Sequence, residues 1–161
     1  MKLCKQIAFL SGLALASATQ ALAQVEMTAL HTTGISCGSC ALIAELNLKR
    51  LPGVDGVTIS RSQEAVLISY KPGATFDPDG IREVLEPLGV GIARMQISAR
   101  GRAQEQGLKQ SFVAGKNKFA VVTAAKAPQI PSGTLVLIEA VVNERSDPMA
   151  LTVMTVKPLK Q

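Results

Sequence analysis

The stretch HTTGISCGSCALIAELNLKRLPGV, residues 31–54, holds two of the chain's three cysteines, Cys37 and Cys40. Directly after the first cysteine, apolar residues recur at steps of three and four, the spacing of a helix with one buried face. This pattern predicts a helix from Gly38 to Leu51, ended by the Pro-Gly pair that follows. The predicted buried stripe comprises Ala41, Leu42, Ala44, Leu46, Leu48 and Leu51. Both cysteines are therefore expected in or beside the first helical turn.

On either side of this helix, alternating apolar residues and turn signals indicate further elements. Strands are predicted at Val25–His31, Val54–Ile59, Ala65–Tyr70 and Val90–Ile97, with a hairpin turn at Arg61–Glu64. A second helix is predicted after Asp77, an N-cap residue, with Pro78 in its first position. The order strand, helix, strand, strand, helix, strand is the split βαβ or ferredoxin-like arrangement. An α+β fold is therefore predicted, with this domain at residues 24–98.

Residues 99–161 have a different character and are predicted to form a small all-β domain. Residues 24–98 carry six basic and eight acidic side chains, whereas residues 99–161 carry nine basic and four acidic ones. Arg100–Gly107 is polar and is predicted to precede the strands of the second domain. Those strands are predicted at Gln110–Ala114, Lys118–Ala124, Leu135–Asn143 and Ala150–Val156. Their spacing suggests a small barrel, for which an OB-like fold is one possibility, or a sandwich.

Composition argues against several kinds of binding site. Aromatic residues make up 3% of the chain and there is no tryptophan, which disfavours a base-stacking platform or a sugar site. The basic second domain raises nucleic acid as a partner. However, its only aromatic residues are Phe112 and Phe119, and we favour a solvated basic surface, with no nucleic acid bound.

The first residues are predicted to be a cleavable signal peptide, residues 1–23. A short basic start precedes an apolar run of about 12 residues, too short for a membrane span, and Ala21–Ala23 fits a cleavage site before Gln24. An uncleaved anchor is the alternative. Cleavage would remove Cys4 and leave an exported protein with no membrane span in the mature chain. We expect the bacterial periplasm as its location, with secretion as the alternative.

The spacing of Cys37 and Cys40 allows three kinds of chemistry. As metal ligands, two thiolates on one helix face would converge on one soft ion, for which Cu(I), Ag(I) and Hg(II) are suited. Zn(II) fits less well because it usually takes four ligands, and His31 is the only histidine. We expect His31 to face water at a strand end. The alternatives are a thiol-disulfide redox pair and a structural disulfide, although so short a loop would stabilise the fold little.

The residues around this motif resemble those of heavy-metal-associated domains, which occur in copper chaperones, in metal-pumping ATPases and in periplasmic mercury-binding proteins. Gly34–Cys40 resembles their glycine-x-x-Cys-x-x-Cys loop, and Leu51–Val54 matches their leucine-proline-glycine-valine element. Val66–Tyr70 resembles the strand that follows in the family, and Leu88-Gly89 matches the pair that ends its second helix. The resemblance covers residues 25–98.

This resemblance implies that Cys37 and Cys40 are the metal ligands. Two positions depart from the family: Ile35 stands where a methionine is usual, and Val90 where an aromatic residue is common. The function expected from residues and resemblance together is capture of a soft metal ion, Cu(I) favoured, and its transfer to a metal transporter or metal acceptor protein. No catalytic residues or resident cofactor are expected, so we do not expect an enzyme. An adaptor acting through the second domain remains an alternative.

Overall fold

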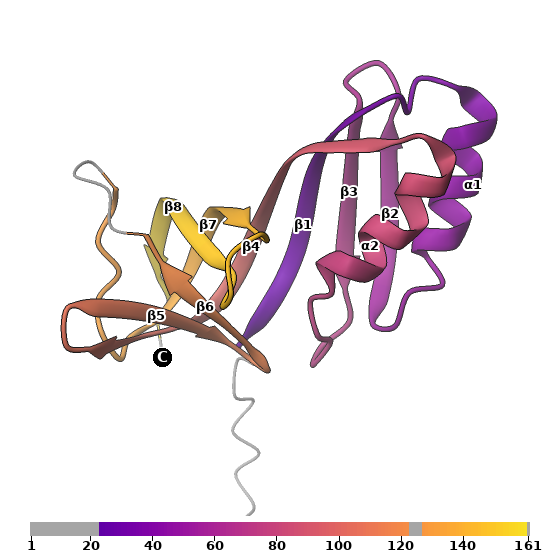
Figure 1. Cartoon of the computed structure of the whole chain (residues 1–161). Helices are drawn as coiled ribbons and strands as arrows, with labels where there is room; N and C mark the ends of the chain where they lie inside the picture. Colours follow the sequence, from indigo (N-terminus) through magenta and orange to yellow (C-terminus); the bar gives the residue numbers. More distant parts are fainter. Residues whose placement is uncertain (1–22, 123–126, 161) are drawn as a thin grey trace, which may run out of the picture.

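The computed structural model describes residues 23–122 and 127–160 of the 161-residue chain (Figure 1). The predicted signal peptide, apart from Ala23, lies outside the described residues. The first six elements are β1 (Gln24–Thr33), α1 (Gly38–Leu48), β2 (Val54–Ser60), β3 (Ala65–Tyr70), α2 (Pro78–Leu85) and β4 (Gly91–Gln106), with a 3₁₀ turn, η1 (Glu86–Leu88), before β4. The last four are β5 (Lys109–Ala114), β6 (Asn117–Val121), β7 (Leu135–Asn143) and β8 (Ala150–Pro158).

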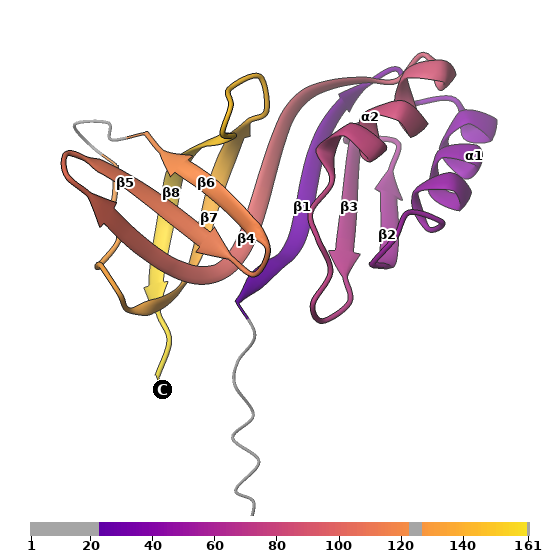
Figure 2. The same ribbon diagram turned by 60° about the horizontal axis from the view of Figure 1, so that its bottom comes forward.

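The first unit, from β1 to the first half of β4, has the predicted ferredoxin-like arrangement. Its strands lie in the order β2-β3-β1-β4, and every neighbouring pair is antiparallel. Both helices cover the same face of this sheet (Figures 1 and 2). Because the β1–α1 loop, the β2–β3 turn and the start of β4 all lie at one end of the sheet, residues far apart in the sequence meet there.

Helix α1 has a narrower buried face than predicted. Ala41, Ala44 and Leu48 are buried, but Leu42 and Leu46 are 58% and 50% exposed, so the prediction of one stripe containing all of them was wrong. At 100° per residue, positions 42 and 46 project away from the 41-44-48 face. The helix is apolar almost all round, and only the side toward the sheet is covered.

Helix α1 also ends earlier than Leu51. The backbone N–H groups of Arg50 and Leu51 donate to residues three positions back, Asn47 and Leu48, at 3.1 Å each. Such tighter bonds are typical of a closing helical turn, and the proline that follows disfavours helical backbone in the residue before it. The second helix begins as predicted, because the Asp77 carboxylate accepts the Gly80 N–H at 3.0 Å.

Strand β4 is longer than predicted and continues through the predicted division between residues 98 and 99. Its first half pairs with β1 and its second half pairs with β5, while β7 pairs along the middle. The polar stretch Arg100–Gly107 is therefore mostly strand rather than a connection. Gly101 lies where the strand passes closely over β5: a Cβ at this position would be 2.2 Å from the Val113 carbonyl oxygen.

The second unit is a ring of five paired strands, β4-β5-β6-β8-β7, that returns to β4. The β6–β8 pair is parallel and the others are antiparallel. Phe112, Phe119, Ile138 and Leu151 are fully buried inside it. The predicted strand Leu135–Asn143 matches β7 at both ends, and the other three predicted strands overlap β5, β6 and β8.

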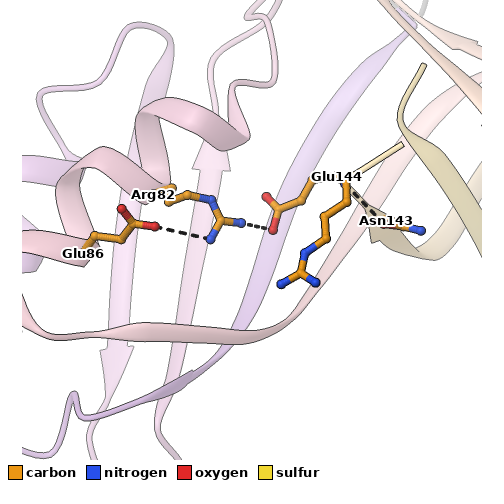
Figure 3. A network of polar contacts seen from close by, with 5 residues as sticks. Arg82, Glu86, Asn143 and Glu144 are labelled. Atoms are coloured by element: carbon orange, nitrogen blue, oxygen red, sulfur yellow. Dashed lines mark hydrogen bonds and ion pairs between the residues drawn. The ribbon is translucent and has the colours of Figure 1, made fainter. Parts of the chain in front are cut away.

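Polar contacts and an aromatic pair hold the two units together. Arg82 on α2 forms an ion pair with Glu144, just beyond β7, and a second with Glu86 at 3.6 Å (Figure 3). Phe76, just before α2, packs its ring against Phe119 of β6 with centroids 6.2 Å apart. The two units therefore share a strand, a hydrophobic contact and an ion-pair network. The helices in the described ranges fall short of the length and hydropathy that a membrane span requires.

Candidate metal centre

The loop that carries the cysteines is held from two sides. Gly34 has a left-handed backbone, with φ of 87°, and a Cβ there would be 2.8 Å from the Gly89 carbonyl oxygen. Its N–H donates to a carboxylate oxygen of Glu64, in the β2–β3 turn, at 3.1 Å. The next side chain, Ile35, is fully buried beneath the loop. A glycine and an apolar residue at these two positions therefore set the path of the chain into α1.

Cys37 is the N-cap residue of α1. Its backbone is extended, and its sulfur accepts the Cys40 N–H at 3.4 Å, so the side chain takes the place of the usual capping oxygen. The Ser39 hydroxyl lies 3.1 Å from the same sulfur. Both cysteines are free thiols, with Cys37 exposed and Cys40 partly exposed. The structure thus brings the two predicted ligands together at one surface position.

The two thiols have different acidities because they interact. Hydrogen bonding from the Cys40 thiol, followed by that from the Ser39 hydroxyl, lowers the pKa of Cys37 to about 7. Donating to Cys37 is also the largest reason that the pKa of Cys40 is raised, with burial next. Near neutral pH Cys37 is therefore about half ionised, while Cys40 keeps its proton.

The described part of the chain places no third ligand beside the pair. It contains no group of three or more His, Cys, Asp and Glu side chains that could hold a metal ion. His31 is exposed near the end of β1, as expected, and is in no such group. Cys4 lies outside the described residues. Two sulfur donors without a carboxylate or imidazole match the low coordination number of soft monovalent and mercuric ions better than the four-ligand shell of zinc.

The two residues that differ from the family pattern, Ile35 and Val90, are both buried. Ile35 is 0% exposed and Val90 is 1% exposed, so each contributes to the core under the site. The Val90 N–H also donates to the Leu85 carbonyl at 3.2 Å, which fixes the start of β4. Val90 therefore belongs to the hydrophobic core of the protein.

Sequence reasoning treated Arg61–Glu64 only as a hairpin turn, but both end residues reach the cysteine loop. Glu64 binds Gly34, as described above. Arg61 extends its guanidinium over Gly38, where a Cβ would lie 3.2 Å from Nη1. The ferredoxin-like order places the β2–β3 turn beside the β1–α1 loop. The contact of these two residues with the cysteine loop therefore follows from the strand order and not from the local sequence pattern.

Comparison with known proteins finds one curated relative that matches in sequence. A copper-exporting P-type ATPase of Bacillus subtilis is 33% identical over 64 residues, which are 40% of this chain and 8% of that protein. The resemblance to heavy-metal-associated domains is confirmed over this part of the chain. The chain spans less than a tenth of the length of that ATPase. No family model matches the chain.

Two solved structures are similar to parts of the chain. The yeast copper transporter domain CCC2A is 25% identical, covers 44% of this chain and 97% of its own, and has a TM-score of 0.37. The N-terminal soluble domains of Bacillus subtilis CopA are also 25% identical, covering 54% of this chain and 56% of that one, with a TM-score of 0.38.

Proposed function

We propose that this protein is an exported carrier of a soft metal ion, with Cu(I) its favoured cargo. The observation that carries the proposal is the pairing of two free, surface-accessible thiols, Cys37 and Cys40, at the start of α1. Thiolates select soft ions. The sequence match to a copper-exporting ATPase supports copper among the soft ions.

Cargo binding would release the thiol protons to solvent. At neutral pH Cys37 is half ionised, so it would make the first metal bond, and the metal's positive charge would then displace the proton of Cys40. With only two protein ligands, the bound ion would stay open to an incoming thiolate from a partner. Transfer would proceed by stepwise exchange of sulfur ligands. The metal ion would keep its oxidation state throughout. We therefore propose a carrier and not an enzyme.

The partner in this proposal is a metal transporter or another metal acceptor protein, and the compartment is the periplasm. The signal-peptide pattern of residues 1–23 supports export. For the second unit we propose an OB-like barrel, supported by its ring of five strands, one pair of which is parallel. In the carrier, this unit would dock on the partner rather than bind nucleic acid.

The test is a Cu(I) competition titration of the reduced protein, residues 24–161, under anaerobic conditions against a chromophoric Cu(I) chelator. One tightly held Cu(I) per chain is expected. The control is the double variant Cys37→Ser/Cys40→Ser, which keeps a good N-cap residue and so keeps α1. Equal Cu(I) uptake by this variant would show that the assignment is wrong.

A second candidate function is thiol-disulfide exchange, favoured by the lowered pKa of exposed Cys37. A redox protein would reduce insulin disulfides, and its Cys40→Ser variant would accumulate mixed disulfides through Cys37. A carrier would bind Cu(I) without doing either. The two functions are therefore separable with the same set of variants.

A further inference from the structure

The charge of the loaded site depends on which ion it carries. Two thiolates contribute two negative charges, so a bound monovalent ion, Cu(I) or Ag(I), leaves the site with a net charge of −1. Bound Hg(II) leaves it neutral. A fixed positive charge nearby would therefore stabilise the monovalent complexes and leave the mercuric complex almost unaffected. Such a charge would distinguish two classes of ion that are both suited to thiolate ligands.

Among the described residues, Arg61 is a cation in the right place. Arg61 places its guanidinium over Gly38, the residue that follows the first cysteine. Its side chain is exposed, and among the residues described in 23–122 and 127–160 no carboxylate forms an ion pair with it. By contrast, Arg82 and Arg100 form ion pairs with glutamates. The charge of Arg61 is therefore available to the cysteine loop.

The turn that carries Arg61 is fixed to that loop rather than free to swing. The Glu64 carbonyl accepts two hydrogen bonds from Thr32, one from its N–H at 2.7 Å and one from its hydroxyl at 2.8 Å. The Glu64 carboxylate accepts the Gly34 N–H at 3.1 Å, and the Glu64 N–H donates to the Arg61 carbonyl at 3.4 Å. Thr32 and Gly34 lead into the cysteines, so the turn and the loop form one hydrogen-bonded unit.

We propose that Arg61 is a specificity-determining residue that balances the negative charge of a monovalent ion bound by Cys37 and Cys40. Relative to Hg(II), the site then binds Cu(I) and Ag(I) more tightly than it would without this charge. This inference rests on the proposed metal binding at the two cysteines and adds to it the class of ion selected.

The experiment compares Ag(I), Cu(I) and Hg(II) affinities of wild type, Arg61→Met, Arg61→Lys and Arg50→Met by competition titration. Arg61→Met keeps a long side chain without the charge. Arg50→Met is the control, because it removes an exposed cation just beyond the C-terminal end of α1, far along the helix from the cysteines. Two unit charges about 4 Å apart in water interact by about 1 kcal/mol, which corresponds to about a fivefold change in affinity, so Arg61→Met should weaken Cu(I) and Ag(I) binding by up to about fivefold. Hg(II) binding should stay within twofold, and Arg61→Lys and Arg50→Met should resemble wild type.

Ionic strength gives a readout that a purely structural role would not move. The loss of Cu(I) affinity in Arg61→Met should shrink as salt is raised from about 0.01 M to 1 M, because screening shortens from about 30 Å to about 3 Å. An equal loss for all three ions, or no loss, would overturn the inference while leaving metal binding intact. A wild-type protein that binds no more Cu(I) than the double serine variant would instead refute the proposed function itself.

Discussion

The side-chain amide of Asn117 pairs with both backbone polar groups of Phe76. Its oxygen accepts the Phe76 N–H at 3.1 Å, and its nitrogen donates to the Phe76 carbonyl at 3.1 Å. Asn117 is the first residue of β6, and Phe76 immediately precedes the cap of α2, so the pair spans the boundary between the units. Both residues are buried, which makes this double hydrogen bond the polar counterpart of the Phe76–Phe119 ring contact.

Replacing Asn117 with alanine should destabilise the whole protein. Two buried backbone groups of Phe76 would lose their partners, each at about 1–3 kcal/mol, so a loss of about 2–6 kcal/mol in the free energy of unfolding is expected. Urea unfolding measures it. Asn143→Ala is the matched control: Asn143 is exposed and its side chain accepts only the Arg145 N–H, at 3.2 Å, so it should cost under about 1 kcal/mol. Similar losses in the two variants would contradict the assigned role.

Tyr70 should make the protein sensitive to alkaline pH. Burial raises the pKa of its hydroxyl to about 12, and the hydroxyl lies 3.1 Å from that of Thr28. The folded state therefore keeps this proton at a pH where the unfolded state has lost it, so stability falls as pH rises from about 10 to about 12. The full effect is about 2.7 kcal/mol, from about 1.36 kcal/mol per pKa unit.

The alkaline effect can be measured directly because the chain has one tyrosine and no tryptophan. Phenolate absorbance should report a midpoint near pH 12 in the folded protein. Urea unfolding between pH 9 and 11 should show stability falling less steeply in Tyr70→Phe than in wild type. A folded-state midpoint near pH 10 would mean that the hydroxyl is open to water.

Local signals predicted most of the elements well. Asp77 followed by Pro78 marked the start of α2, and the bounds of β7 matched at both ends. The features that local patterns did not predict depend on contacts with residues distant in the sequence. β4 continues past residue 98 because β5 and β7 pair with it there, and a polar stretch with a glycine at position 101 carries no local sign of such partners.

The cysteine pair was predictable because an i, i+3 spacing at a helix start brings side chains together. Its surroundings were less so. The roles of Arg61 and Glu64 depend on one hairpin turn meeting a loop about 30 residues earlier in the chain, which only the strand order determines. Leu42 is exposed because only one side of α1 contacts the sheet. In a helix that is apolar on most sides, the spacing of apolar residues does not show which side that is.

Cys37 should react with alkylating reagents far faster than Cys40 in the reduced, metal-free protein. With its pKa near 7, Cys37 is about half thiolate at neutral pH, whereas the raised pKa of Cys40 keeps that thiol protonated. The rate of modification by iodoacetamide should rise through pH 7 and level off about one unit higher. Ser39→Ala should shift this rise to higher pH, because it removes the second hydrogen bond to the sulfur. Peptide mass spectrometry locates the label, and equal labelling of both cysteines at pH 7 would rule out the assignment.

Glu64 should control how firmly the cysteine loop is held. Glu64→Ala removes the acceptor for the Gly34 N–H, a bond worth about 1 kcal/mol, so exchange of the Gly34 amide hydrogen should accelerate about fivefold. Glu64→Gln keeps a neutral acceptor and should stay close to wild type. Hydrogen exchange followed by NMR gives the rate, and an unchanged Gly34 rate in Glu64→Ala would show that the carboxylate does not hold the loop.

The backbone of Glu64 allows this effect to be separated from strain. Its φ of 46° is positive, a conformation that costs a residue with a side chain about 1 kcal/mol relative to glycine. Glu64→Gly should therefore unfold at higher urea than Glu64→Ala, while both show the same faster exchange at Gly34. The loop depends on the carboxylate and the turn depends on the backbone, so the two measurements should change independently.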